Sequence, residues 1–275
     1  FTTPLMAQDS SKKGDKGPSV YLPIRLVGFL AIGLPTISIC ACIISTFFTH
    51  SAEIAKYSIA NCKNVQSGIP PVSNAIASWR PQKQLWSLSV IMHLPARMLI
   101  MMMLPQSWHS RICKTLFHAA TSIEMLGLVC LSLFFSESKV YDHIHMASFG
   151  LWGLFTIISM IIAICNQLVS GRFRNGDFVN RLWLAKMAVL ISFILSCFAI
   201  TLSYWLAQKY CSAPAFIIFC AGEYALIALN AAFWIILVVE FSRDFKGFQI
   251  VVVPDNPTES SSTRAVTENP DENLG

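Results

Sequence analysis

The chain has 275 residues, of which 54% are hydrophobic and only 13% are charged. Soluble domains carry about 25% charged residues, so this composition excludes an ordinary water-soluble domain. The formal net charge of +5 does not indicate nucleic-acid binding, because the basic residues are scattered over short segments between apolar runs. No nucleic-acid partner is therefore expected.

Six apolar runs are each long enough to cross a bilayer as a helix. A hydrocarbon core of about 30 Å requires about 20 helical residues. In chain order, the predicted spans are 26–48, 84–104, 115–135, 144–168, 184–206 and 215–239. The runs are continuous rather than alternating in polarity, which excludes a membrane β-barrel. The sequence predicts an all-α, six-helix transmembrane bundle within residues 21–250.

The segments outside the spans differ in composition. Residues 1–20 are polar, and residues 251–275 are rich in Ser, Thr, Pro, Asn and Glu. Such segments cannot bury enough apolar surface to fold, so both are predicted to be disordered tails. The loop at 49–83 is different, because it contains the apolar run 70–76. We expect this loop to pack across the ends of the helices.

Lysine and arginine are unevenly divided between the two sides of the predicted bundle. Thirteen lie on the side that carries both tails and the loops at 105–114 and 169–183, with Lys186 counted there. Six lie on the other side, and Arg97 lies within a span. Cytosolic segments carry the excess of basic residues. Both termini are therefore predicted to be cytosolic, and the loops at about 49–83, 136–143 and 207–213 to face the lumen or the exterior.

Two cysteines stand apart from the rest by position. Of the nine in the chain, only Cys62 and Cys211 fall in the loops predicted to be lumenal, one in the first loop and one in the last. Disulfides persist in such a compartment. We expect a disulfide between Cys62 and Cys211; the alternative is two unpaired thiols.

Ionisable and amide side chains interrupt three of the spans. His93 and Arg97 are four residues apart and share a helix face, Glu124 lies in the third span, and Glu223 and Asn230 share a face of the sixth. A charge at the bilayer centre costs about 2.5 kcal/mol or more, so it normally faces the bundle interior and has a partner. We expect one interior cluster, with Arg97 paired to either glutamate.

Two interpretations of this cluster stay open at the level of sequence. The first is structural, an ion pair that fixes the register of the helices. The second is functional, a polar site that binds a charged lipid headgroup or relays a proton. The spacing of the residues alone does not select between them.

Small residues in the fourth span give a weaker packing signal. Gly150 and Gly153 are close in sequence, and small residues let membrane helices approach each other. They predict a close helix contact in this span.

The segment Asp142-His143-Ile144-His145 stands at the start of the fourth span. Alternating histidines beside a carboxylate are metal-ligand types, but no third and fourth ligands occur at suitable spacing. No metal ion and no cofactor are therefore expected. Imidazole titrates near neutral pH, which makes His143 a candidate general base. The alternative is an interfacial histidine with no chemical role.

Several landmarks together resemble the Frag/DRAM/Sfk family of six-span membrane proteins. They are Cys62, Pro-Pro-Val-Ser-Asn-Ala-Ile at 70–76, Pro81-Gln82, Trp86, His93-Leu94-Pro95-Ala96-Arg97, Glu124, His143, Tyr210-Cys211, Glu223-Tyr224, Asn230 and Phe233. Their order and spacing from about residue 22 to residue 245 carry the resemblance.

The resemblance implies a role in lipid remodelling of glycosylphosphatidylinositol (GPI) anchors. In that pathway a lyso-GPI intermediate regains a saturated acyl chain in Golgi and endoplasmic reticulum membranes. The implied partners are lyso-GPI-anchored proteins or GPI lipid, other membrane lipids and other GPI-remodelling proteins. Arg97, Glu124, Glu223 and Asn230 would bind the substrate, and His93 or His143 would act as a base. Whether the chain is the acyltransferase or an accessory factor stays open.

Other branches of the same family act in autophagy or regulate phosphoinositide kinases and lipid asymmetry. The alternative function is therefore a non-enzymatic membrane regulator or scaffold. Its activity would lie in the basic segment 169–186 and in the Ser/Thr-rich C-terminal tail.

Overall fold

The computed structural model describes residues 19–54, 58–59, 62–66, 68–108, 110–135, 139–169, 177–244 and 247–251. The chain forms two compact units, residues 23–246 and the two terminal segments. In the terminal unit, β1 (Ser19–Pro23) and β4 (Gly247–Val251) form a two-stranded sheet. The predicted disordered tails lie outside the described residues, except where they overlap these two strands.

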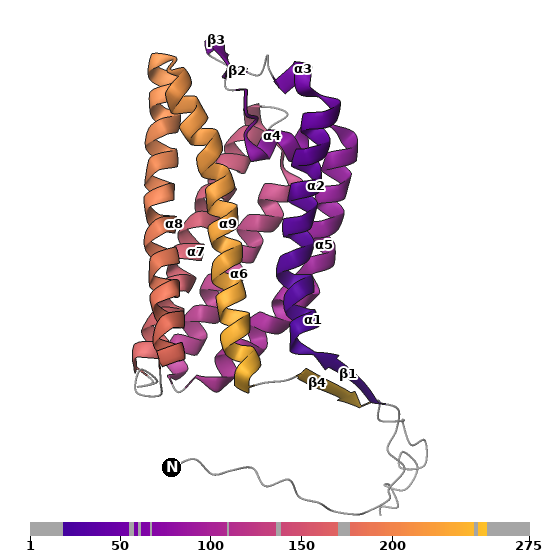
Figure 1. The fold of residues 1–275 in the computed structure, drawn as a ribbon, viewed down its shortest axis with the longest axis vertical. Helices are drawn as coiled ribbons and strands as arrows, with labels where there is room; N and C mark the ends of the chain where they lie inside the picture. Colours follow the sequence, from indigo (N-terminus) through magenta and orange to yellow (C-terminus); the bar gives the residue numbers. More distant parts are fainter. Residues whose placement is uncertain are drawn as a thin grey trace, which may run out of the picture. The chain divides into compact units, whose positions relative to one another are not determined.

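The larger unit is a bundle of long helices (Figure 1). In the described part of the chain, six helical segments are long and apolar enough to cross a membrane. They cover Ile24–Thr49, Arg80–Gln106, Arg111–Leu133, Tyr141–Val169, Asn180–Tyr210 and Ala213–Arg243. The predicted all-α, six-span bundle is confirmed. The side of the membrane on which the termini lie stays a prediction.

Each of the first two spans contains one turn that departs from the α-helix. The first span consists of α1 (Ile24–Gly28), a π-helical turn η1 (Phe29–Gly33) and α2 (Leu34–Thr49). The π turn ends two residues before Pro35, which lacks the backbone donor of a regular helix. The second span is α5 (Arg80–Met103), which continues through Pro95 and ends in the 3₁₀ turn η2 (Leu104–Ser107).

The other four spans are α6 (Arg111–Leu133), α7 (Lys139–Val169), α8 (Asp177–Tyr210) and α9 (Ala213–Asp244). Ser110 caps α6, since its hydroxyl accepts a hydrogen bond from the backbone N–H of Cys113 at 3.3 Å. Helix α6 packs on α7, α8 on α9, and α2 on α5. In Figure 1, α8 and α9 stand on one side of the bundle and α2 and α5 on the other.

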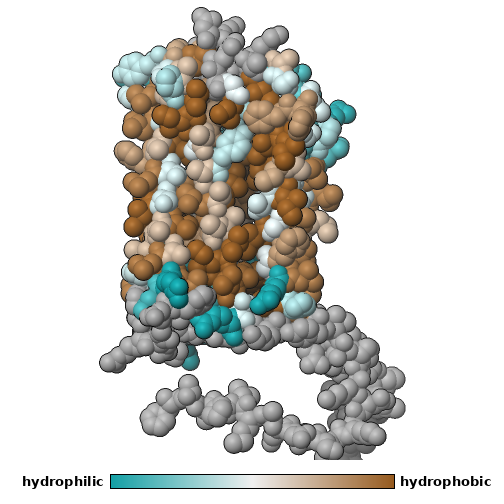
Figure 2. All heavy atoms as spheres, viewed as in Figure 1, coloured by the Kyte–Doolittle hydropathy of each residue, from teal (hydrophilic) through white to brown (hydrophobic). Residues whose placement is uncertain are grey.

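The outer surface of the bundle matches a membrane environment. Figure 2 shows hydrophobic residues over most of the height of the bundle and hydrophilic residues gathered near its ends. Large apolar side chains on α8, among them Leu195, Phe198 and Trp205, are more than half exposed. Lipid chains, rather than water, are the environment that such a surface requires.

The segment between the first two spans folds against the helices, as the sequence predicts. It contains α3 (Ser51–Ile54), α4 (Val72–Ala77) and the antiparallel pair β2 (Ser58–Ile59) and β3 (Cys62–Gln66). Cys62 forms a disulfide with Cys211, which lies between α8 and α9. We call the end of the bundle that carries α3, α4 and this disulfide the loop end.

Helices α6 and α7 lie close together at Gly127. A Cβ atom there would lie 3.0 Å from the backbone nitrogen of Trp152 and 3.3 Å from the carbonyl oxygen of Ser148. Backbone atoms of a helix cannot move aside as a flexible side chain can. At Gly150 and Gly153 a Cβ atom would meet nothing within 4 Å, so the prediction that these two residues mark a close contact is wrong.

Replacing Gly127 with leucine is expected to push α6 and α7 apart and to destabilise the protein by about 1–3 kcal/mol, the usual cost of overpacking. The measurement is the thermal unfolding midpoint of the purified chain in detergent. Gly150→Leu is the matched control and is expected to leave the midpoint unchanged, because Gly150 is exposed. Equal losses in both variants would contradict the assigned contact.

Candidate functional site

A cavity of about 110 Å³ lies inside the bundle. A cavity of this volume can hold several groups of the size of a water molecule. The described residues that line it come from η1, α2, α4, α5, α6, α7 and α9. Its polar lining residues are Thr36, Ser73, His93, Arg97, Glu124, His145, Glu223 and Asn230. The remaining lining is mainly aliphatic and aromatic, so one cavity presents both kinds of surface.

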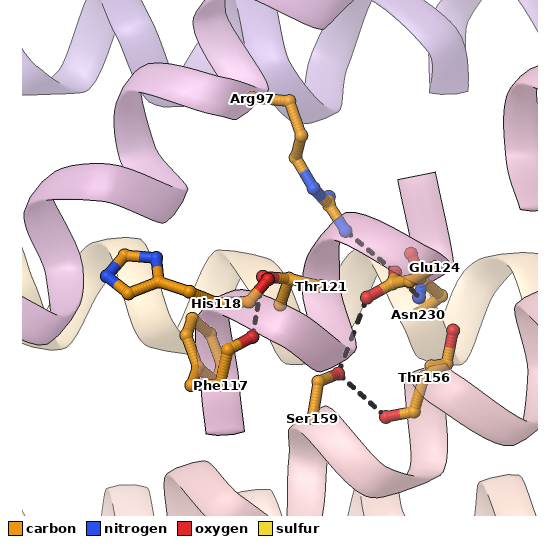
Figure 3. Close-up of polar contacts among 8 residues, drawn as sticks. All are labelled: Arg97, Phe117, His118, Thr121, Glu124, Thr156, Ser159 and Asn230. Atoms are coloured by element: carbon orange, nitrogen blue, oxygen red, sulfur yellow. Dashed lines mark hydrogen bonds and ion pairs between the residues drawn. The ribbon is translucent and has the colours of Figure 1, made fainter. Parts of the chain in front are cut away.

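Arg97 and Glu124 form a buried ion pair within this cavity. Nη2 of Arg97 lies 3.0 Å from Oε1 of Glu124, and the two side chains are 7% and 2% exposed. Figure 3 shows the guanidinium reaching from its helix to the carboxylate. Of the two partners that the sequence leaves open for Arg97, the structure selects Glu124.

Three helices converge on the Glu124 carboxylate. Nδ2 of Asn230 on α9 donates to Oε1 at 3.4 Å. The Ser159 hydroxyl on α7 lies 3.4 Å from Oε2 but only 2.9 Å from the carbonyl oxygen of Thr156 (Figure 3). A hydroxyl has one proton to donate, so the nearer carbonyl competes for it. Oε2 is therefore the less satisfied oxygen of the carboxylate.

The guanidinium of Arg97 has a second partner and a remaining donor. Its Cζ atom lies 3.5 Å from the ring centroid of Trp234, a cation–π contact. Its Nε atom is buried and has no hydrogen-bond partner among the described residues. Arg97 is thus fixed by an ion pair and an aromatic ring, and its Nε–H group has no acceptor among the described residues.

Glu223 lines the same cavity but does not pair with Arg97. Its Oε2 accepts a hydrogen bond of 2.6 Å from the backbone N–H of Val72, the first residue of α4. The neighbouring Tyr224 donates through its hydroxyl to the carbonyl oxygen of Pro70 at 2.9 Å. Helix α9 therefore holds the beginning of α4, whose residues Val72, Ser73 and Ile76 form the loop-end wall of the cavity.

The three histidines that the sequence singles out have different positions. His93 is buried and lines the cavity, with Nδ1 3.3 Å from the carbonyl oxygen of Ser89 in its own helix. His143 is exposed and is not one of the described lining residues. His145 lines the cavity instead. The sequence could have indicated the position of His145, because residues 145, 149 and 152 share one helix face. Phe149 and Trp152 also line the cavity.

A second buried polar group lies away from the cavity. Lys186 is 1% exposed; its Nζ lies 2.8 Å from Oε2 of Glu240 and also donates to Oε1 of Gln167. These residues tie α8 to α9 and α7. Lys186 is therefore not part of an open basic surface, which removes one residue from the segment that the regulator hypothesis uses. In the described part of the chain, no three His, Cys, Asp or Glu residues are grouped as a metal site.

Comparison with known proteins points to one family. Residues 23–243 match the family model described as the Frag1/DRAM/Sfk1/Cwh43P N-terminal domain. The chain is 24% identical over 230 residues to post-GPI attachment to proteins factor 2 of Caenorhabditis briggsae, covering 80% of this chain and 86% of that protein. The protein of the same name in Caenorhabditis elegans is 23% identical over 231 residues, with the same coverage.

A vertebrate relative has a more specific name. Acyltransferase PGAP2 of Xenopus tropicalis is 25% identical over 230 residues, covering 80% of this chain and 88% of that protein. No solved structure gives a significant match. The matched region, residues 23–243, contains every described residue that lines the cavity.

Proposed function

Since the chain belongs to the Frag1/DRAM/Sfk1/Cwh43P family, we propose that it remodels the lipid of GPI anchors. It would take part in giving a lyso-GPI intermediate a saturated acyl chain. The names of its relatives support this, one being a post-GPI attachment factor and another an acyltransferase. The proposal places this multi-pass membrane protein in Golgi and endoplasmic reticulum membranes, with lyso-GPI-anchored proteins as its substrates.

One observation carries the proposal: a single cavity within the membrane-spanning bundle is lined by both polar and apolar side chains. A lipid with one acyl chain removed likewise has a polar part, the headgroup, and an apolar part, the remaining chain. Apolar lining residues such as Ile39, Leu128 and Leu131 suit a hydrocarbon chain, which would leave the surrounding bilayer at little cost. The buried polar residues suit the glycerol and phosphate of the same molecule.

In this proposal the polar residues have separate tasks. The guanidinium of Arg97, which lines the cavity, donates to an oxygen of the glycerol–phosphate region, a charge-assisted contact that is strong at low local dielectric. Glu124 and Asn230 hold Arg97 in place, and Glu223 positions α4. His93 lies one helical turn from Arg97 and is the candidate base for the reacting hydroxyl.

The test is the lipid composition of GPI anchors, measured by mass spectrometry in cells that lack this protein. Saturated diacyl anchors are expected to be lost in these cells and restored by the wild-type chain. Failure of the wild-type chain to restore them would contradict the proposed function.

A matched pair of variants tests whether the cavity is the lipid site. Ala231→Phe places a ring in the cavity, which Ala231 lines, and is expected to abolish the rescue. Ala228→Phe adds the same ring at an exposed position of the same helix and is expected to rescue fully. Equal rescue by both variants would show that the lipid binds elsewhere.

A further inference from the structure

His145 is held in the cavity wall by a backbone carbonyl group. Its side chain is buried, and its Nδ1 atom lies 2.9 Å from the carbonyl oxygen of Phe134. Phe134 is the C-cap of α6, where carbonyl groups have no partner within the helix. A carbonyl oxygen only accepts, so Nδ1 must carry the proton, and in the neutral ring Nε2 then carries the lone pair. His145 therefore presents a hydrogen-bond acceptor.

Contacts between helices place His145 at the loop end of the cavity. Trp86 on α5 donates through Nε1 to the hydroxyl of Ser132 on α6 at 3.2 Å. Phe134, two residues further along, contacts His145 on α7. Trp86 also packs in one apolar cluster with Val72 of α4. His145, Trp86 and α4 thus share one level of the bundle.

The Arg97–Glu124 pair lies farther from the loop end than His145 does. Residue positions along α5, α6 and α7 each give an estimate of this separation. At 1.5 Å per residue, the distance along the axis is about 16 Å from residue 86 to 97 on α5 and about 15 Å from residue 124 to 134 on α6. On α7 it is about 21 Å from residue 145 to Ser159, the contact of Glu124. The cavity is therefore elongated, with an acceptor near the loop end and a donor at Arg97 in the middle of the bundle.

We infer that the loop end of the cavity is a subsite for the inositol ring of the substrate headgroup, with Nε2 of His145 accepting a hydrogen bond from a ring hydroxyl. The inference rests on the proposed function and deepens it. The inositol follows the phosphate on the side away from the glycerol, so a lipid whose glycerol oxygen lies at Arg97 places its phosphate, and then its ring, progressively closer to the loop end. The hydroxyl groups of a polyol donate hydrogen bonds, and the lone pair of His145 Nε2 in the cavity wall can accept one of them.

The inference assigns His145 to recognition of the headgroup rather than to catalysis. His143, two residues earlier in the helix, is exposed and outside the described lining. His93 lies near the deep end, beside Arg97. Substitutions of the three histidines are therefore expected to differ in their effect on ligand preference.

Binding of two lysolipids to the full-length chain in nanodiscs tests the inference. Lysophosphatidylinositol carries the ring, and lysophosphatidic acid of the same acyl chain lacks it. The wild type is expected to bind lysophosphatidylinositol about tenfold or more tightly than lysophosphatidic acid, since a buried acceptor left without its donor is costly. His145→Phe is expected to remove this preference by weakening lysophosphatidylinositol alone.

Two further variants separate hydrogen bonding from packing. His145→Gln keeps a polar side chain that can accept a hydrogen bond and is expected to retain part of the preference. His118→Gln removes a histidine whose ring lies well away from Glu124 in Figure 3 and is expected to behave as the wild type. Equal weakening of both lysolipids in His145→Phe, or an unchanged preference, would overturn the inference. Because the readout is binding, either result leaves the anchor-composition test of the proposed function standing by itself.

Discussion

Replacing Glu124 alone with leucine is expected to destabilise the folded protein by about 3–5 kcal/mol, the usual cost of leaving one buried charge without its partner. Arg97 would keep its charge in a site where it is 7% exposed, and its contact with the Trp234 ring would not replace the lost carboxylate. Replacing both members of the pair, as Arg97→Met with Glu124→Leu, is expected to restore most of that stability. The measurement is the thermal unfolding midpoint in detergent.

The double variant is expected to fold because it removes both charges and keeps the packing. Methionine is long and unbranched, and its sulfur makes favourable contacts with aromatic rings, so it can lie on Trp234 as the guanidinium does. Replacing a buried ion pair with apolar residues of similar volume is often neutral or stabilising. A double variant as unstable as Glu124→Leu would show that the site cannot accept apolar residues.

The same double variant separates the two interpretations that the sequence leaves open. If the ion pair serves only to fix helix register, a folded double variant restores saturated diacyl anchors in cells that lack the protein. If the pair binds substrate, the folded double variant restores none, because no donor is left for the glycerol–phosphate region. We expect the second result, since Arg97 and Glu124 both line the cavity.

The features that sequence predicts well depend on one-dimensional patterns. The apolar runs give the six spans because the thickness of the bilayer fixes the length of a crossing helix. The ion pair of Arg97 follows from the cost of an isolated charge in lipid, although that argument leaves Glu124 and Glu223 equivalent. Only the arrangement of the helices in space distinguishes the two glutamates.

The features that sequence misses depend on partners that are main-chain atoms or lie on the opposite side of a helix. Glu223 contacts the backbone N–H of Val72, and every residue except proline carries such a group, so no side-chain pattern marks the contact. His143 and His145 differ by two residues, which on a helix turns one away from the interior that the other faces. Lys186 is assigned to the basic side by its position near a loop, but it is buried against Glu240.

Replacing Glu223 with alanine is expected to release the start of α4 from α9. Leaving the backbone N–H of Val72 without its acceptor costs about 1–3 kcal/mol, which corresponds to about a 5- to 150-fold change in a local opening equilibrium. Amide hydrogen exchange followed by mass spectrometry measures this directly. Peptides that cover Val72–Ala77 are expected to exchange about 5- to 150-fold faster, while peptides from α6 are unchanged.

Two further variants are expected to accelerate the exchange of α4 less than Glu223→Ala does. Glu223→Gln keeps an oxygen that can accept from Val72, so its exchange is expected to lie between those of the wild type and alanine. Tyr224→Phe removes only the hydroxyl that donates to Pro70, a neutral hydrogen bond of about 0.5–1.5 kcal/mol, and is expected to accelerate exchange by about tenfold or less. Faster exchange throughout the bundle in Glu223→Ala would mean that the residue supports the whole fold.

The functional consequence of this variant follows from which wall of the cavity moves. Helix α4 supplies Val72, Ser73 and Ile76 to the loop end, while the Arg97–Glu124 pair is held by α5, α6, α7 and α9. A released α4 should therefore weaken the contacts of the inositol ring and spare those at Arg97. Glu223→Ala is expected to lower the preference for lysophosphatidylinositol over lysophosphatidic acid, as His145→Phe does, whereas loss of Arg97 weakens both lysolipids. The same result for all three variants would mean that the two ends of the cavity do not act as separate subsites.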